Sequence, residues 1–399
     1  MPTQATRQRR PRNRKAQLAE LASELFRARG YHGVGITDIA AAAGVTGPAL
    51  YRHFSDKQAI LAHVVLTAVD ELATATTIAV DGSEGPAPAQ VNTLIRTLAK
   101  LSVERREVAA LWRTERRHLR AEDRSELRRR STALLTMWAR TLLAIRPGLS
   151  PGDAELLSWA ALSVFGSVSV HRTRIGKRRF ESLLVECARA VLHCTLPTPQ
   201  GTMADATPER AESQVLRTSR RERLINEAGR LFQERGFHEV SMEDIGTAAG
   251  ISGPSVYRHF PSKAALFVAS ATRLADRLAL GRAQVAREAA DEAGALRGLV
   301  TSYVDIMRSS ADLMTIGRQV NALSAAEQAE LRRVQRDYVQ EWARLLCAVR
   351  PELSTGEGRI VVHVALTIAN DLLRTRHIAQ RPNVEAELVA LMCAALGVG

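Results

Sequence analysis

Aromatic residues make up only 4% of this 399-residue chain, whereas hydrophobic residues make up 46%. This scarcity argues against an aromatic-rich sheet and favours helices. Cysteine is also rare: Cys187, Cys194, Cys347 and Cys393 form no CxxC pair and no metal-finger spacing. We therefore expect reduced cysteines, no metal site and no cofactor.

Long apolar runs and a secretory signal are missing as well. The longest apolar stretch, 155–170, contains Glu155 and several serines and is short for a bilayer span. The basic N-terminus, MPTQATRQRRPRNRK, is not followed by an apolar core. We expect a cytoplasmic protein that does not enter a membrane.

Acidic residues are too few to balance the basic ones, and the formal net charge is +13. Such a surplus favours a polyanionic partner, either nucleic acid or an anionic membrane surface. No HExxH, GxSxG or Walker-type motif occurs, and no GxGxxG follows a strand. We therefore do not expect an enzyme.

The chain instead contains a duplication. GVTGPALYRHFSDK at 44–57 returns as GISGPSVYRHFPSK at 250–263, and 25–47 aligns with 231–253 at the same offset of 206. Much later, 137–150 aligns with 341–354 at an offset of 204. A nearly constant offset indicates two copies of one fold.

Each copy is predicted to be all-helical. Residues 14–29 have helical spacing of apolar side chains, and Gly30 follows as a stop. We expect Thr37 and Thr46 to cap the next two short helices, and Ser55 with Gln58 to form a capping box for a long fourth helix. In the second copy the corresponding starts lie near Ser241, Ser252 and Ser262. The Arg-rich segment 118–130 is expected to be a solvated helix face.

Two short helices joined by a Gly-containing turn after a longer helix are typical of a helix-turn-helix. The second short helix would enter the major groove of DNA, where Thr46 and Ala49 are small enough to meet base edges or a thymine methyl group. Arg52 could reach a base or a phosphate, whereas Leu50 and Phe54 are expected to pack inward.

Both copies resemble the TetR family of bacterial transcriptional regulators over roughly 50 residues each. The resemblance rests on T-D-I-A-x-x-A-G-V-T and LYRHFSDKQAIL in the first copy, and on S-M-E-D-I-G-x-x-A-G-I-S and VYRHFPSKAALF in the second. The whole chain is similar to single-chain tandem members found in actinobacteria.

The resemblance implies an N-terminal three-helix DNA reader and a larger ligand-binding and dimerisation domain in each copy. The positions that match the family's phosphate contacts are Thr37, Tyr51, His53, Lys57, Ser241, Tyr257, His259 and Lys263. The positions where the family reads bases are Thr46, Gly47, Pro48, Arg52, Ser252, Gly253, Pro254 and Arg258.

The expected domain order is a basic arm with the first reader (1–58), a helical domain (59–195), a linker (196–214), the second reader (215–264) and a second helical domain (265–399). Residues 8–57 carry a net charge of +5, whereas the aligned window 214–263 carries +2. The excess lies in the N-terminal arm, which could follow a groove or the DNA backbone.

In the larger domains, helices at 153–172, 180–194, 357–376 and 384–396 are expected to form a four-helix bundle, as in a dimer of the family. The simplest arrangement is an internal pseudodimer, and the alternative is a homodimer of two chains. A small apolar effector could bind near Trp112, Trp138, Trp159 and Phe165, or near Tyr303, Met307, Met314 and Trp342, although each of these is also an ordinary core residue.

These features predict a sequence-specific regulator, a ligand-responsive repressor that reads a pseudo-palindromic operator in double-stranded DNA with two recognition helices from one chain. The alternative is a constitutive or architectural DNA-binding protein without an effector.

Overall fold

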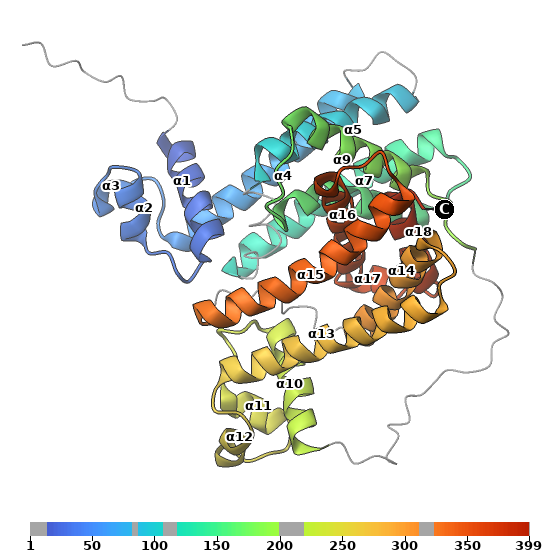
Figure 1. Ribbon diagram of the computed structural model, residues 1–399. Helices are drawn as coiled ribbons and strands as arrows, with labels where there is room; N and C mark the ends of the chain where they lie inside the picture. Colours follow the sequence, from blue (N-terminus) through green and yellow to red (C-terminus); the bar gives the residue numbers. More distant parts are fainter. Residues whose placement is uncertain (1–13, 82–86, 107–117, 199–218, 311–322, 399) are drawn as a thin grey trace, which may run out of the picture. The chain divides into compact units, whose positions relative to one another are not determined.

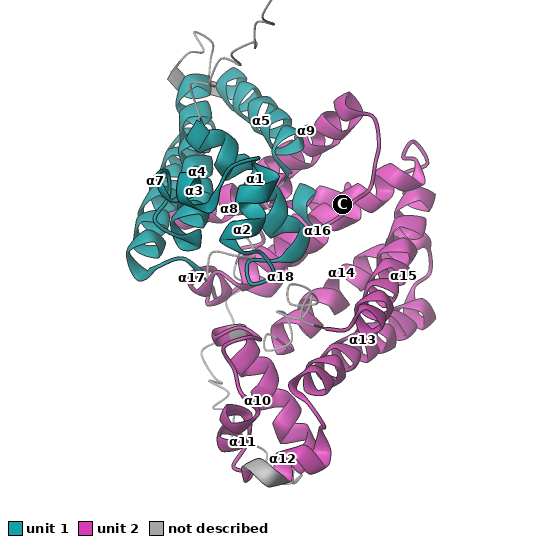
Figure 2. Ribbon diagram, turned by 90° about the vertical axis from the view of Figure 1, so that its left-hand side faces the viewer, with its two compact units in different colours: residues 1–148, 168–170 teal, residues 149–167, 171–399 magenta. Residues whose placement is uncertain are grey.

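The computed structural model describes residues 14–81, 87–106, 118–198, 219–310 and 323–398, and within these ranges the fold is all-helical, without a strand (Figure 1). The predicted all-α class is therefore confirmed. The chain divides into two compact units (Figure 2). Unit 1 holds residues 1–148 and 168–170, and unit 2 holds 149–167 and 171–399. The units do not coincide with the two sequence copies, because the last two helices of the first copy belong to unit 2.

Unit 1 consists of a small three-helix group and three longer helices. Its helices are α1 Arg14–Arg29, α2 Ile36–Ala42, α3 Gly47–Tyr51, α4 Lys57–Asp81, α5 Ala87–Glu104 and α7 Ala121–Ile145. The group α1–α3 packs on α4 through α1, and α4 also packs against α5 and α7. Apolar side chains from α1, α2, α3 and α4 share one core that includes Leu18, Phe26 and Ile39.

Unit 2 repeats this arrangement and adds the end of the first copy. Its helices are α8 Pro151–Gly166, α9 Lys177–His193, α10 Arg220–Glu234, α11 Met242–Ala248, α12 Gly253–His259, α13 Lys263–Glu288, α14 Glu292–Ser309, α15 Ala325–Val349, α16 Thr355–Leu373, α17 Arg376–Ala379 and α18 Val384–Leu396. A 3₁₀ turn, Ser167–Ser169, follows α8. Helices α10–α12 lie together at one end of α13 (Figure 1).

Two of the expected helix caps in the first copy are wrong. Helix α2 begins at Ile36, so Thr37 lies inside it; the N-cap is Gly35, whose backbone N–H donates to the Asp38 carboxylate at 2.7 Å. At α4, Asp56 accepts from the backbone N–H of Ala59 at 2.8 Å, in place of the expected Ser55. The carboxylate next to Ser55 is the stronger acceptor, and it moves the start of the helix by one residue.

The caps of the second copy agree better with expectation. Ser241 accepts from the N–H of Asp244 at 3.0 Å, and Ser262 accepts from the N–H of Ala265 at 3.1 Å. Thr46 and Ser252 occupy N-cap positions, but their side chains accept no capping hydrogen bond.

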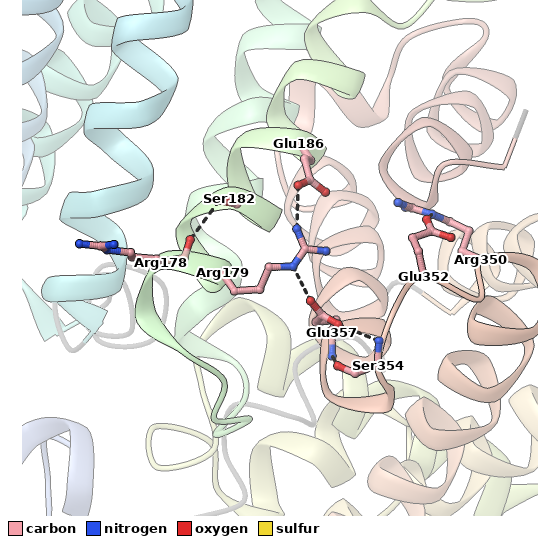
Figure 3. Close-up of polar contacts among 8 residues, drawn as sticks. All are labelled: Arg178, Arg179, Ser182, Glu186, Arg350, Glu352, Ser354 and Glu357. Carbon is pink, nitrogen blue, oxygen red and sulfur yellow. Dashed lines mark hydrogen bonds and ion pairs between the residues drawn. The ribbon is translucent and has the colours of Figure 1, made fainter.

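Within unit 2, helices from the two sequence copies pack together. Helix α8 packs against α16, and α9 packs against α18, in addition to the pairs α8–α9 and α16–α18. The side chain of Arg179 donates to Glu357, and Figure 3 shows it lying between Glu186 and Glu357. Arg381 donates to Asp153 at 2.5 Å. The four helix positions match the expected ranges, except that α8 ends earlier, at Gly166.

One described helix, Lys57–Val80 in α4, is long and apolar enough to cross a membrane, and it differs from the 155–170 stretch singled out in the sequence. The core helix of a folded domain satisfies the same test. In unit 1 this helix packs against α1, α5 and α7, which accounts for its apolar composition.

Candidate nucleic-acid interface

The first reader is defined as α1–α3 with the residues that join them to α4. Buried apolar side chains on its inner face fix the position of α3. Leu50 is fully buried and Phe54 is 4% exposed, as the sequence predicted. In the second reader, defined as α10–α12 with the residues that join them to α13, Val256 and Phe260 are buried in the same way. Each of the two helices α3 and α12, which stand where the sequence predicted the recognition helices, is therefore held by apolar contacts on one side, and its other side is exposed.

The exposed side presents the same three side chains in both copies. Tyr51 is 54% exposed and is followed by exposed Arg52 and His53. Tyr257 is 58% exposed and is followed by exposed Arg258 and His259. A tyrosine ring usually buries its apolar body, so the same exposed Tyr-Arg-His sequence on both helices presents hydroxyl, guanidinium and imidazole groups to a partner.

The turn before each recognition helix depends on a glycine. Gly44 has φ +62° and Gly250 has φ +64°, in the left-handed region that glycine adopts without strain. The N–H of Val45 donates to the carbonyl of Ala40 at 2.9 Å, and the N–H of Ile251 donates to Gly246 at 2.8 Å. The turn geometry is thus the same in both readers. The side chains of Gly253 and Pro254 lie outside the described part of the second reader.

The two lysines expected to contact phosphate have partners inside the fold. Lys57 Nζ donates to the carbonyls of Tyr31 and Val34, both at 2.9 Å, and lies 4.1 Å from the centre of the Tyr31 ring. Lys263 Nζ donates to the carbonyl of Val240 at 2.7 Å, and burial lowers the pKa of this lysine. Each ammonium therefore ties the loop after the reader's first helix to the start of the next long helix. The sequence did not predict this role, and the phosphate contact stays a prediction.

Thr37 and Ser241 occupy different positions relative to the starts of their helices. Gly35 and Ser241 are the N-caps of α2 and α11, so they are equivalent, and the equivalent of Thr37 is Glu243. Thr37 and Ser241 are both exposed near a helix start. Their phosphate contacts therefore stay predictions at two different positions of the module.

The residues just before α7, 118–120, contact the first reader and the start of α4, which the sequence did not reveal. The ring of His118 stacks on Tyr31 with centroids 4.7 Å apart, Gln58 donates to the carbonyl of His118 at 3.1 Å, and Arg120 forms an ion pair with Asp56. Arg130, farther along α7, pairs with Asp70 of α4. The expected solvated face at 118–130 is present, with Arg124, Arg128 and Arg129 exposed, but other side chains of the segment contact the first reader and α4.

The second copy joins its reader to its helical part with fewer polar groups. Leu323 is buried in the reader core, as Leu119 is in the first copy. Ser262, Ala264 and Ser324 stand where the first copy has Asp56, Gln58 and Arg120. The ion pair between Arg120 and Asp56 is thus a feature of the first copy alone.

Most of the described residues proposed to line effector pockets are buried core residues, whereas Trp159 is half-buried. Trp138 of unit 1 is 3% exposed, and its Nε1 donates to Thr76 at 3.2 Å. Trp159 and Phe165 belong to α8 in unit 2. Trp112 and Met314 lie outside the described residues.

In the second copy the proposed pocket residues Tyr303, Met307 and Trp342 are all buried, and the ring centroids of Tyr303 and Trp342 lie 5.9 Å apart. The Tyr303 hydroxyl donates to Asn370 at 3.1 Å, and burial raises the pKa of Tyr303 to about 12.

The fold and the exposed helices define a protein with two helix-turn-helix modules. The family described as bacterial regulatory proteins, tetR family, matches the chain twice, at residues 18–64 and 224–270. The chain therefore carries the N-terminal module of the TetR family in tandem.

Two curated relatives are similar to part of the chain. The HTH-type transcriptional activator FasR of Mycolicibacterium smegmatis is 33% identical over 108 residues, which cover 27% of this chain and 49% of that protein. The HTH-type transcriptional repressor KstR2 of Rhodococcus jostii is 30% identical over 110 residues, which cover 28% and 54%. The chain thus spans about half the length of the curated relatives it matches.

Among solved structures, a tetR-family regulatory protein from Rhodococcus RHA1 is 22% identical, with a TM-score of 0.41. The similarity covers 46% of this chain and 98% of that one.

Proposed function

We propose that this chain is a sequence-specific DNA-binding transcriptional regulator that reads a pseudo-palindromic operator with α3 and α12. One observation carries the proposal: each module fixes its recognition helix on a buried core and exposes the same Tyr-Arg-His sequence. Such groups suit phosphate and base contacts at the edge of a major groove. The net charge of +13 supports the same partner.

The two modules act as an internal pseudodimer in this proposal. Dimeric regulators that use a helix-turn-helix present two readers to two half-sites, and this chain supplies both readers itself. The packing of α8 on α16 and of α9 on α18 within unit 2 supports the proposal, because it joins helices of the two sequence copies. The alternative is a homodimer of chains that presents four readers.

We further propose that a small apolar effector controls DNA binding in the cytoplasm. An effector that binds one helix arrangement better than another shifts the population, and its power is limited to the difference in affinity. The curated relatives include one activator and one repressor, so the proposed repression rests on the family resemblance alone. A constitutive or architectural DNA-binding protein is the alternative.

Selection from a randomised duplex pool tests the function, and native mass spectrometry of the selected complex tests the pseudodimer. We expect an enriched motif with two half-sites and one chain per motif over a protein titration. Two chains per motif would favour the homodimer, and the absence of any enriched motif would favour the architectural alternative. Loss of the selected complex on addition of an apolar compound would identify an effector.

A further inference from the structure

The two recognition helices, α3 and α12, differ in two small side chains that are not fully buried and in one buried apolar side chain, Leu50 against Val256. Gly-Pro and Tyr-Arg-His-Phe occur in both, whereas Thr46 and Ala49 of the first copy correspond to Ser252 and Ser255 of the second. Ala49 and Ser255 are both half-buried at the same register, one residue before a buried apolar side chain. Leu50 and Val256 are both fully buried, so a difference in DNA recognition between the two helices is expected to come from residues 46, 49, 252 and 255.

The chemistry of the two positions is different. Ala49 offers only a methyl group, which matches the methyl group of thymine. Ser252 donates to Ser255, with the two hydroxyl oxygens 3.0 Å apart. Two hydroxyls that share one hydrogen bond retain one proton for an outside acceptor, whichever of them donates to the other. Thymine O4 and purine N7 or O6 are such acceptors in the major groove.

We propose that residues 49 and 255 determine specificity and make the operator asymmetric. The first reader binds a half-site with a thymine methyl group at the position that residue 49 contacts. The second reader binds a half-site with a hydrogen-bond acceptor at the position that residue 255 contacts. Because the two half-sites differ, the chain binds in one orientation, with its first copy always on the same side of the operator. This inference rests on the proposed function of the two helices as DNA readers.

Selection from a randomised duplex pool with the full chain provides the test, using wild type, Ala49→Ser, Ser255→Ala and the double variant. The wild type should enrich a motif with unlike half-sites. Ala49→Ser should make both half-sites of the second kind, and Ser255→Ala should make both of the first kind. The double variant should restore an asymmetric motif. Each single variant should bind the wild-type motif about tenfold more weakly than its own.

The outcomes separate this inference from the function on which it rests. If the wild type enriches no motif, the proposed function itself is wrong. An enriched motif with two equal half-sites, or one that the single variants leave unchanged, would overturn the inference and leave the function intact. Helical circular dichroism and a thermal melt of each variant show that the chain is folded, so that a lost motif cannot come from unfolding. Ile78→Ala, at an exposed position on α4, serves as the control that should keep the wild-type motif.

Discussion

Arg179, at the start of α9, donates to Glu357 in the first turn of α16, a residue 178 positions later in the chain. The second copy makes the equivalent contact to the first: Arg381, just before α18, donates to Asp153 in the first turn of α8. Each arginine also bonds a glutamate that follows it, Arg179 to Glu186 at 2.9 Å and Arg381 to Glu387 at 2.7 Å.

This exchange between the copies has the form of an isologous contact, in which each partner gives the other the same type of interaction. In a homodimer a two-fold axis would produce it. Here the duplicated sequence produces it within one unit of one chain, and this supports the proposed pseudodimer.

The ion pair at Glu357 predicts that acid weakens unit 2. Hydrogen bonds from Ser354 and Arg179 lower the pKa of Glu357 from 4.5 to about 2. A lowered pKa in the folded state stabilises the fold above the unfolded value, and this contribution is lost as pH falls from about 4.5 toward 2. The urea midpoint of the wild type should therefore fall more between pH 6 and pH 3 than that of Glu357→Gln.

The control for this experiment is Glu181→Gln on α9, which should keep the acid sensitivity of the wild type. Equal acid sensitivity in the wild type and Glu357→Gln would show that the pair between Arg179 and Glu357 does not stabilise the folded chain.

The two tyrosines of the recognition helices give a direct test of DNA contact. Tyr51→Phe and Tyr257→Phe remove only a hydroxyl from an exposed ring, so the free energy of unfolding should not change. A lost hydrogen bond to a phosphate should weaken binding of the selected duplex about tenfold for each variant. Fluorescence anisotropy at fixed salt measures this. Tyr303→Phe is the contrasting control: it loses a buried bond to Asn370 and should lower stability while the folded protein keeps its DNA affinity.

The sequence predicted what depends on periodicity and repetition. The duplication follows from the repeated sequence, and the short helices, inward Leu50 and outward Tyr51 follow from local spacing. Contacts between distant residues left no such signal: Lys57 bonds carbonyls 23 and 26 positions earlier, and Arg120 meets Asp56 across 64 positions. The cap at Asp56 was missed because two adjacent residues, Ser55 and Asp56, could both accept the bond, and only the folded helix start decides between them.

Substitution of the lysine at the start of α4 and of α13 distinguishes a structural role of the ammonium group from a contact with a DNA phosphate. In Lys57→Met and Lys263→Met two backbone carbonyls lose their donor, which should lower the free energy of unfolding by about 1–3 kcal/mol. If the ammonium acts only inside the fold, the slope of log affinity against log salt should stay unchanged. A phosphate contact would instead reduce that slope by about 0.9. Lys100→Met, at an exposed position on α5, should change neither quantity.

Deletion of residues 1–12 tests whether the basic arm binds DNA. The arm lies outside the described residues, and it carries Arg7, Arg9, Arg10 and Arg12. Each phosphate that an arginine neutralises releases a counterion, so the deletion should make the salt slope shallower, by at most about 3.6 if all four act.

A full-length variant with these four arginines changed to glutamine should reproduce the deletion, because the effect depends on charge and not on length. The loss of affinity should be largest at low salt, where phosphate contacts contribute most. If the slope is the same with and without the arm, the extra charge of the first reader does not act on DNA. A difference in DNA affinity between the two readers would then have to come from residues outside the arm.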